Sequence, residues 1–273
     1  MIVSSGQQYT VSSGQTAFGD IAIGDGATIV VDFGGVTSTT AVRSGARLNV
    51  SSGGIASGTS LSGYAIEFVS SGATAADTTA GGGGQAIVGP GGVALGAIML
   101  GGGAQTIGNG GQASGTTLSS GGMQFISSGG AAVGTVVSNA GEVVVSGTIT
   151  GATILSGGRE NVSSGGVASN VLVSFGGIEF VSSGGRASGT VVASAGQSIV
   201  GPGGTTVSAT MSDGAIQTIG WGGVASGTNL KAHGIGYVSA GGMIVGAVIS
   251  GSGSGYISGI AVSTTLAGGW QVI

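Results

Sequence analysis

The chain has no cysteine, only two prolines and very few charged residues. Of its 273 residues, five are Lys or Arg and nine are Asp or Glu, so 5 + 9 = 14 carry charge and the formal net charge is -4. The absence of cysteine excludes a disulfide framework and thiolate zinc sites. Five basic side chains cannot neutralise a phosphate backbone, which excludes nucleic acid as a partner. His233 is the only histidine, so neither a His-based metal site nor a Ser-His-Asp triad is expected. The sequence predicts no cofactor.

The chain also lacks a long apolar run and a recognisable targeting segment. The best apolar stretch, Val93–Leu100, is broken by Gly96, and a membrane-spanning helix needs about 20 consecutive apolar residues. Met1 is followed at once by repeat-like sequence, Val3-Ser4-Ser5-Gly6-Gln7. No signal peptide is therefore expected, and if the protein is exported its targeting and anchoring parts lie outside this sequence.

What the chain does have is glycine, 65 residues of it, and a short repeat. The motif Val-Ser-Ser-Gly-Gly and its variants recur along the chain, and we call the apolar first residue of each copy the anchor. Every step between anchors is 19 residues, except the step of 17 from Val145 to Val162. The anchors are Val31, Val50, Val69, Val88, Ile107, Ile126, Val145, Val162, Val181, Val200, Ile219, Val238 and Ile257.

A longer period contains the short one. The sequence Ile66–Gly72 returns as Ile178–Gly184, and Ile87–Gly92 returns as Ile199–Gly204, each 112 residues later. Since 112 equals 6 × 19 − 2, the sequence indicates a six-coil block around 47–158 that is duplicated around 159–270. We expect one domain over 1–273, with the two missing residues absorbed at one corner between Val145 and Val162.

The repeat predicts an all-β fold. Short runs of β-branched residues between glycine pairs are typical of strands and turns, because glycine takes positive φ without steric cost. A helix is disfavoured by about 1 kcal/mol for each interior glycine. A 19-residue unit cannot bury its own apolar face, so successive units must stack. We therefore expect a right-handed parallel β-helix, a β-solenoid of about fourteen coils spaced by ~4.8 Å.

The residue types found at each repeat position indicate which positions face the interior of the solenoid and which face solvent. The anchor is always Val or Ile and is expected to face inward. The position two residues later accepts many types and is expected to be exposed: Phe33, Ser52, Pro90, Asn109, Trp221 and Ala240. The residue before the anchor is often aromatic, as in Phe68 and Phe180, and strict alternation cannot bury it together with the anchor. Either a bend or an exposed aromatic ladder resolves this conflict.

The repeat, clearest at Val50–Gly63, Ile107–Gly122 and Val181–Gly196, resembles the AIDA-type repeat of self-associating bacterial autotransporter adhesins. The resemblance covers roughly Val3 to Ile273. It implies a secreted passenger held at the cell surface and outer membrane by a separate C-terminal β-barrel translocator, which this chain lacks. It also implies adhesion, autoaggregation, biofilm formation and virulence, with self-association or binding to a host-cell or glycan surface. Several members of this family are glycoproteins, O-glycosylated on serine by bacterial heptosyltransferases.

The candidate acceptors are the paired serines that follow the anchors. They are Ser51, Ser52, Ser70, Ser71, Ser127, Ser128, Ser163, Ser164, Ser182 and Ser183. The second serine of each pair is the better candidate, because its position also tolerates Pro, Trp and Phe and is expected to face solvent. The alternative is that these hydroxyls only satisfy backbone groups at the turn.

Two other functions fit a β-solenoid. A polysaccharide-degrading enzyme needs paired carboxylates, and Glu160 and Glu179 fall at the same position of adjacent coils. Gln105, Gln124 and Gln217 take that position elsewhere, which favours a hydrogen-bonded ladder over acid–base chemistry, so we expect no enzyme.

An ice-binding solenoid needs a flat outward column of threonines. Thr116, Thr135 and Thr190 would supply such a column if they face outward. It would be interrupted by Ala97, Val171, Ala209 and Ala247.

Overall fold

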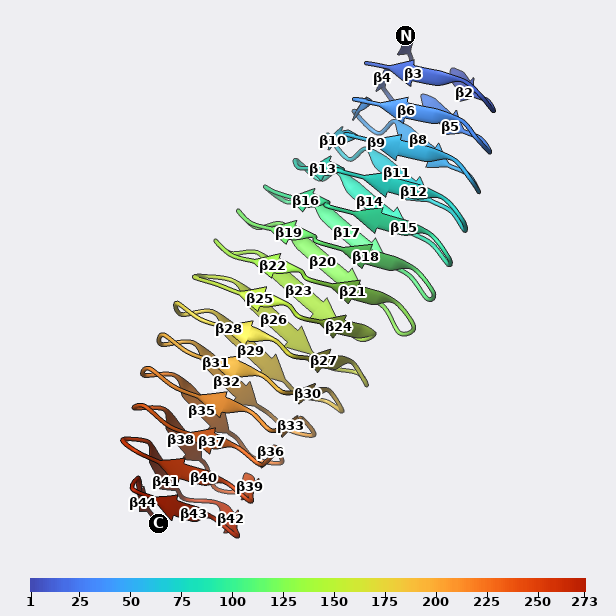
Figure 1. Ribbon diagram of the computed structural model, residues 1–273. Coiled ribbons are helices and arrows are strands. Elements are labelled where there is room, and N and C mark those ends of the chain that lie inside the picture. Colours follow the sequence, from blue (N-terminus) through green and yellow to red (C-terminus); the bar gives the residue numbers. More distant parts are fainter. The chain divides into compact units, whose positions relative to one another are not determined.

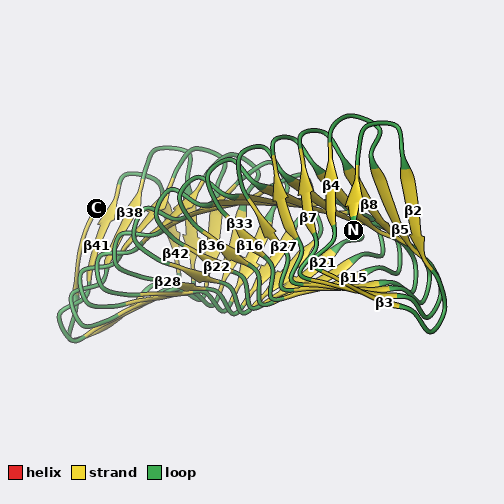
Figure 2. Ribbon diagram, turned by 90° about the horizontal axis from the view of Figure 1, so that it is seen from above, coloured by secondary structure: helices red, strands yellow, loops and turns green.

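A computed structural model describes residues 1–273, all in strands, turns and bends without a helix. The chain divides into two compact units, Met1–Thr135 and Val136–Ile273, which are described separately. In each unit the chain coils through three strands per turn, and the strands of successive coils form three parallel sheets, A, B and C (Figures 1 and 2). The structure contains no helix of the length and apolarity that a membrane crossing requires.

The first unit contains β1 to β21. Its sheet A consists of β1 (Ile2–Val3), β4 (Ile21–Ile23), β7 (Ala41–Arg43), β10 (Ser60–Ser62), β13 (Thr79–Ala80), β16 (Ile98–Met99) and β19 (Thr117–Leu118). Its sheet B consists of β2 (Gln8–Val11), β5 (Thr28–Val31), β8 (Arg47–Val50), β11 (Ile66–Val69), β14 (Gln85–Val88), β17 (Ala104–Ile107) and β20 (Met123–Ile126). Its sheet C consists of β3 (Thr16–Phe18), β6 (Val36–Ser38), β9 (Ile55–Ser57), β12 (Thr74–Ala76), β15 (Val93–Leu95), β18 (Gln112–Ser114) and β21 (Ala131–Val133).

The second unit contains β22 to β44. Its sheet A consists of β22 (Val136–Val137), β25 (Thr153–Ile154), β28 (Leu172–Val173), β31 (Val191–Val192), β34 (Thr210–Met211), β37 (Asn229–Leu230), β40 (Val248–Ser250) and β43 (Thr265–Ala267). Its sheet B consists of β23 (Glu142–Val145), β26 (Arg159–Val162), β29 (Ile178–Val181), β32 (Gln197–Val200), β35 (Ile216–Ile219), β38 (Ile235–Val238), β41 (Ser254–Ile257) and β44 (Trp270–Val272). Its sheet C consists of β24 (Thr148–Thr150), β27 (Val167–Ser169), β30 (Arg186–Ser188), β33 (Thr205–Val207), β36 (Val224–Ser226), β39 (Met243–Val245) and β42 (Ile260–Val262).

The pairing register reproduces the sequence repeat. Glu67 pairs with Ala86 in the first unit, and Gln217 pairs with Gly236 in the second, each 19 residues apart along parallel strands. The two units together contain about fourteen such coils. The predicted all-β parallel solenoid with a 19-residue coil is therefore confirmed.

The anchors form the inner surface of sheet B. All thirteen are buried, from Val31 at 0 % exposure to Ile257 at 7 %. Sheet A contributes larger aliphatic side chains to the interior, such as Leu61, Met99 and Ile154, whereas sheet C contributes mostly alanines, such as Ala56 and Ala187. Burial of these side chains removes apolar surface from water at every coil, which no isolated repeat could do.

The residue before each anchor faces outward. Phe68 is exposed, and Tyr237 and Tyr256 are exposed and stacked with their ring centroids 5.0 Å apart. The anchor and the aromatic residue before it therefore alternate in the ordinary strand manner. An exposed aromatic ladder is the correct alternative, and no bend is needed.

The two missing residues of the 17-residue step are absent from one corner. Most B-to-C corners contain four residues, whereas Ser146-Gly147 alone connects β23 to β24. A second two-residue corner, Ser258-Gly259, connects β41 to β42. These corners lie 112 residues apart in the sequence, so the short corner belongs to the duplicated block.

Candidate functional site

The corners between sheets B and C, here called B–C corners, carry the candidate serines. A corner such as Ser51-Ser52-Gly53-Gly54 is closed by a hydrogen bond that the Gly54 N–H donates to the Ser51 carbonyl, at 2.8 Å. Successive corners are also joined, because the Gly53 N–H donates to the Gly72 carbonyl of the next coil at 2.9 Å. The corners are therefore ordered extensions of the sheets and repeat the same surface at each coil.

In most coils the fourth corner position is glycine, and the backbone packs closely against the preceding coil there, although Gln15 and Ala73 take this position in two other corners. A Cβ on Gly54 would lie 2.6 Å from the Val31 carbonyl oxygen, and a Cβ on Gly130 would lie 2.7 Å from that of Ile107. Side-chain carbon atoms do not approach a backbone oxygen this closely. The glycine of the Ser-Ser-Gly-Gly phrase thus lets the chain turn tightly and present its serines.

Exposure separates the two serines of each pair. The second serine is exposed in all five pairs, at Ser52, Ser71, Ser128, Ser164 and Ser183. The first serine is only partly exposed in four pairs, and among the first serines only Ser127 is exposed. The predicted exposure of the position two after the anchor is therefore confirmed, and it extends to Phe33 at 73 % and Trp221 at 71 %.

The hydroxyls of the ten candidate serines make no hydrogen bond to another protein group. The alternative that they satisfy backbone groups at the turn therefore has no support in the geometry. In some corners the second hydroxyl points along the coil axis. A Cβ on Gly72 would lie 3.0 Å from Ser52 Oγ, and one on Gly91 would lie 2.7 Å from Ser71 Oγ. Glycine in the next coil thus keeps those hydroxyls uncovered.

One further pair belongs to the same set. Ser12-Ser13 occupies the first B–C corner, both serines are exposed, and the Gln15 N–H donates to the Ser12 carbonyl at 2.9 Å. The pair was missed because its anchor, Val11, precedes the regular series by 20 residues. The phrase Val-Ser-Ser-Gly itself was the signal that could have identified it.

The outward threonine column that the ice-binding alternative needs is absent. Thr116, Thr135 and Thr190 are buried, at 1 % exposure or less. They lie in the interior because the chain turns between sheets C and A, and the in–out alternation of the strand does not continue through that corner. The Ala and Val residues at the equivalent positions of other coils are buried as well. Buried side chains cannot contact ice, so this threonine column does not support the ice-binding alternative.

These threonines are partners of the interior Glu/Gln column. The Thr116 hydroxyl donates to Gln105 Oε1 at 2.9 Å, and the Gln124 amide donates to the same oxygen at 2.7 Å. The hydroxyls of Thr59 and Thr78 donate to the two carboxylate oxygens of Glu67 at 2.9 and 2.7 Å. The hydrogen-bonded ladder predicted for this position is present, and its donors were not recognised from the sequence.

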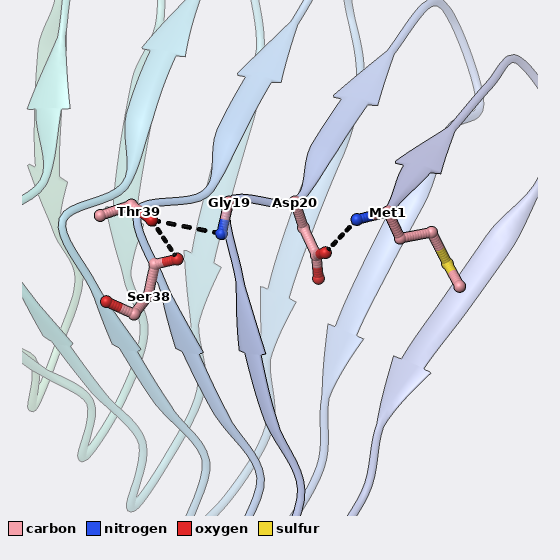
Figure 3. Close-up of polar contacts among 5 residues, drawn as sticks. All are labelled: Met1, Gly19, Asp20, Ser38 and Thr39. Atoms are coloured by element: carbon pink, nitrogen blue, oxygen red, sulfur yellow. Dashed lines mark hydrogen bonds and ion pairs between the residues drawn. The ribbon is translucent and has the colours of Figure 1, made fainter.

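The first C-to-A corner has Asp20 at the position that threonines such as Thr59 and Thr78 take in later coils (Figure 3), and Asp20 is buried and accepts a hydrogen bond from the amino group of Met1 at 2.7 Å. Beside it, the Gly19 N–H donates to the Thr39 hydroxyl at 3.2 Å.

The paired carboxylates of the enzyme alternative lie inside the solenoid. Glu160 and Glu179 are direct neighbours across β26 and β29, as expected, and both side chains are 0 % exposed. Thr190 and Ser198 each donate to Glu179 at 2.9 Å, while neither carboxylate oxygen of Glu160 has a partner. Burial, and then the nearby charge of Glu179, raises the pKa of Glu160 well above its ordinary value. Burial also raises the pKa of Glu179, with its two hydroxyl donors opposing the shift. A polysaccharide chain outside the solenoid cannot contact either carboxylate.

Two further features of the outer surface were candidates for chemistry, a groove on sheet C and the corner of His233. A shallow groove on sheet C is lined by Val93, Leu95, Gln112, Ala113, Ser114, Ala131 and Val133, none of which ionises. His233 lies at an exposed corner, where its ring faces Ser252 at 3.2 Å. No three His, Asp or Glu side chains come together as a metal site would require.

Comparison with known proteins shows a strong similarity to a solved structure. The chain is similar over its full length to a crystallised fragment of TibA that had been hyper-glycosylated by TibC. The identity is 31%, the alignment covers 98% of that fragment, and the TM-score is 0.89. No family model matches the sequence, and no curated protein matches it.

Two more distant similarities carry no argument about function. The A-module of the mannuronan C-5 epimerase AlgE4 from Azotobacter vinelandii is 14% identical, with a TM-score of 0.31 and coverage of 100% of this chain and 88% of that one. PfbA, a surface adhesin of Streptococcus pneumoniae, is 10% identical, with a TM-score of 0.28 and coverage of 98% and 81%. The identity and coverage of the TibA fragment, together with the shared coil, show that this chain belongs to the family of TibA-like autotransporter adhesin passengers.

Proposed function

We propose that the chain is the passenger segment of a bacterial surface adhesin, and that its B–C corner serines are O-glycosylated with heptose. The passenger is held at the outer membrane by a separate translocator and acts in adhesion and autoaggregation. The observation that carries this proposal is the row of exposed second serines, whose hydroxyls have no protein partner. The similar TibA fragment, which is glycosylated by TibC, supports the same chemistry here.

The modification is a glycosyl transfer to a serine hydroxyl. The serine Oγ attacks the anomeric carbon of a nucleoside-diphosphate-activated heptose, and a new C–O bond forms as the bond from that carbon to the diphosphate breaks. The nucleoside diphosphate leaves, and the serine proton passes to a base of the transferase. Because corners are hydrogen-bonded to one another, each coil offers the enzyme nearly the same surface about 5 Å further along.

Adhesion and self-association fit the composition of the outer surface. The chain carries 14 charged residues in 273, so little electrostatic repulsion opposes the approach of two copies. The outer face of sheet B exposes aromatic side chains such as Phe68, Tyr237 and Tyr256. These rings offer apolar contact area to a second copy, to a host-cell surface or to a glycan.

A non-catalytic role is part of the proposal. The only adjacent pair of glutamates that aligns between coils, Glu160 and Glu179, faces inward and lacks access to solvent. The Glu/Gln exchange along the same column fits a structural ladder, because acid–base catalysis needs the ionisable group.

The direct test is co-expression with TibC, followed by intact-mass measurement and an autoaggregation assay of bacteria that display the chain. We expect mass increments of whole heptose units and settling of displaying cells. Replacing the second serine of each B–C corner should remove the mass added at those corners. A variant with Ser57→Ala and Ser62→Ala, outside the corners, is the matched control and should keep it. An unmodified protein that cleaves a polysaccharide, with cleavage lost in the double variant Glu160→Gln and Glu179→Gln, would replace this proposal with an enzyme.

A further inference from the structure

Each strand of sheet B is preceded by one corner and followed by another. The preceding corner connects a strand of sheet A to the strand of sheet B, and we call these connections A–B corners. We propose that they carry a second row of O-glycosylation acceptors, formed by Ser5, Ser44, Ser120, Ser156 and Ser194. The inference rests on the proposed function and extends it to the opposite edge of sheet B.

The first coil shows that the two kinds of corner have the same local structure. The pentapeptide Val-Ser-Ser-Gly-Gln occurs at Val3–Gln7 in the A–B corner and again at Val11–Gln15 in the B–C corner. The Gln7 N–H donates to the Ser4 carbonyl and the Gln15 N–H to the Ser12 carbonyl, both at 2.9 Å. Each glutamine side chain then accepts from the N–H of its first serine, at 3.0 and 2.8 Å.

The coil that contains β20 repeats this equivalence. Ser119–Gly122 and Ser127–Gly130 are identical Ser-Ser-Gly-Gly tetrapeptides that flank β20. Both are closed by the same turn hydrogen bond, from Gly122 to Ser119 at 2.9 Å and from Gly130 to Ser127 at 2.8 Å. A transferase that recognises the sequence and shape of the B–C corner Ser127–Gly130 therefore finds the same sequence and shape in the A–B corner Ser119–Gly122.

The spacing along the chain is regular as well. Four A–B serines precede a B–C serine by eight residues in the sequence. These pairs are Ser5 and Ser13, Ser44 and Ser52, Ser120 and Ser128, and Ser156 and Ser164.

The A–B serines meet the same physical requirements as the B–C serines. Ser5, Ser44, Ser120 and Ser156 are exposed and Ser194 is partly exposed. None of their hydroxyls bonds to another protein group. Their corners are also ordered by backbone hydrogen bonds between coils, for example from the Gly101 N–H to the Ser120 carbonyl at 2.9 Å.

Backbone conformation does not distinguish the two rows. The left-handed φ of Ser44 (53°), Ser120 (51°) and Ser194 (47°) is matched in the B–C row by Ser164 (53°) and Ser183 (49°). The remaining second serines of both rows have negative φ. An enzyme that accepts the B–C row must therefore accept both conformations found in the A–B row.

The test is a set of variants co-expressed with TibC and mapped by peptide mass spectrometry that preserves the glycosidic bond. The B–C variant combines Ser13→Ala, Ser52→Ala, Ser71→Ala, Ser128→Ala, Ser164→Gly and Ser183→Gly. We expect it to retain up to five heptoses, located on the A–B serines. The A–B variant combines Ser5→Ala, Ser44→Gly, Ser120→Gly, Ser156→Ala and Ser194→Gly, and it should lose the same number. Glycine is chosen where φ is positive, and it already occupies the A–B position at Gly82 and Gly101.

The coil around β20 provides a matched single-site comparison. Ser120→Gly and Ser128→Ala should each remove one heptose, from opposite sides of the same strand. Circular dichroism and melting temperature confirm that each variant is folded. If wild-type protein carries heptose on B–C serines while the A–B serines stay unmodified, the second row is wrong and the proposed function stands. If wild-type protein carries no heptose at all, the proposed function fails and the second row fails with it.

Discussion

Among single residues, the buried glutamates determine how stability depends on pH. Burial raises the pKa of Glu67, Glu160 and Glu179 in the folded protein. The folded state therefore binds these protons more tightly than the unfolded chain does. Their stabilising contribution is complete below the ordinary carboxyl pKa and is lost as pH rises through the raised pKa values of the folded state. The solenoid should consequently be more stable in mild acid than at neutral pH.

Glu160→Gln should remove much of this dependence. Glu160 has two partnerless carboxylate oxygens and lies beside a second buried acid, so a neutral amide relieves the cost of burying charge. We expect the variant to gain about 1–3 kcal/mol at neutral pH, with a flatter stability curve between mild acid and neutrality. Urea unfolding across that pH range measures both effects. Asp213→Asn, at an exposed corner of the same unit, is the control and should leave the curve unchanged. A Glu160→Gln variant that is less stable at neutral pH would contradict this account.

The assignment of inside and outside is tested by two substitutions. Ile126→Asp places a charge at an anchor that is 1 % exposed, and an unpaired buried charge costs about 3–5 kcal/mol. Trp221→Ser alters a side chain that is 71 % exposed, and surface changes usually stay within about 0.5 kcal/mol. Thermal melting should show a large loss for the first variant and almost none for the second. Equal losses would mean that the two positions are misassigned.

Residue types at the anchors were sufficient to predict burial, whereas those in the C-to-A corner were not. Val and Ile alone occupy the anchor position, so its environment follows directly from hydrophobicity. The ice-binding alternative required Thr116 and its equivalents to face outward, and the residue types alone did not show that they face inward. The informative signal was that this position holds Ala or Val in other coils. A position that exchanges Thr with Ala and Val is typical of the interior, where the hydroxyl can donate to a neighbouring Gln or Glu. The sequence did not reveal that Gln105 would supply the acceptor, because that contact joins a strand of sheet B to a corner 11 residues later.

Among strands, the outer aromatic ladder of sheet B protects the last coils of the second unit. Tyr237 stacks on Tyr256 with an interplanar angle of 15°, and Tyr256 meets Trp270 edge-on at a centroid distance of 5.0 Å. Aromatic pairs of this kind contribute about 0.5–1.5 kcal/mol beyond the burial of area.

Tyr256→Ser removes both pairs at once and should loosen β44 (Trp270–Val272). We expect amide hydrogen exchange in β44 to become about 5-fold to 150-fold faster, because local opening becomes easier by about 1–3 kcal/mol for the two pairs. Tyr64→Ser is the matched control, because Tyr64 is 76 % exposed at a corner and has no stacking partner. Unchanged exchange in β44 would show that the ladder does not stabilise the end of the sheet.

The period of the strands was predictable, but the way they meet at corners was only partly so. The 19-residue spacing and the Gly pairs indicated coils and turns, and the 17-residue step placed a deletion between Val145 and Val162. The sequence could not say which of the three corners is shortened. The structure assigns the deletion to Ser146-Gly147, a corner that consequently lacks the second serine and contributes no acceptor to the B–C row.

For the molecule as a whole, low charge determines the kind of self-association to expect. Exposed charges are screened by salt over about 10 Å at 0.1 M ionic strength, but this chain has few of them to screen. If copies associate through neutral polar and apolar contacts, the association constant should change little between low and high salt. Sedimentation velocity over a concentration series at both salt levels measures this. A strong weakening of association in high salt would point instead to ion pairs between the few charged residues.

The central claim is that an ordered solenoid presents corner hydroxyls to a glycosyltransferase. Site-resolved mass spectrometry of the protein co-expressed with TibC tests it most directly, because the structure distinguishes serines only one residue apart. The account predicts heptose on the exposed second serine of a corner, such as Ser52 or Ser71, in preference to the partly buried first serine, Ser51 or Ser70. Interior hydroxyls such as Thr116 should remain unmodified. Absence of heptose from the corners, or heptose on the first serines in preference to the second, would contradict the account.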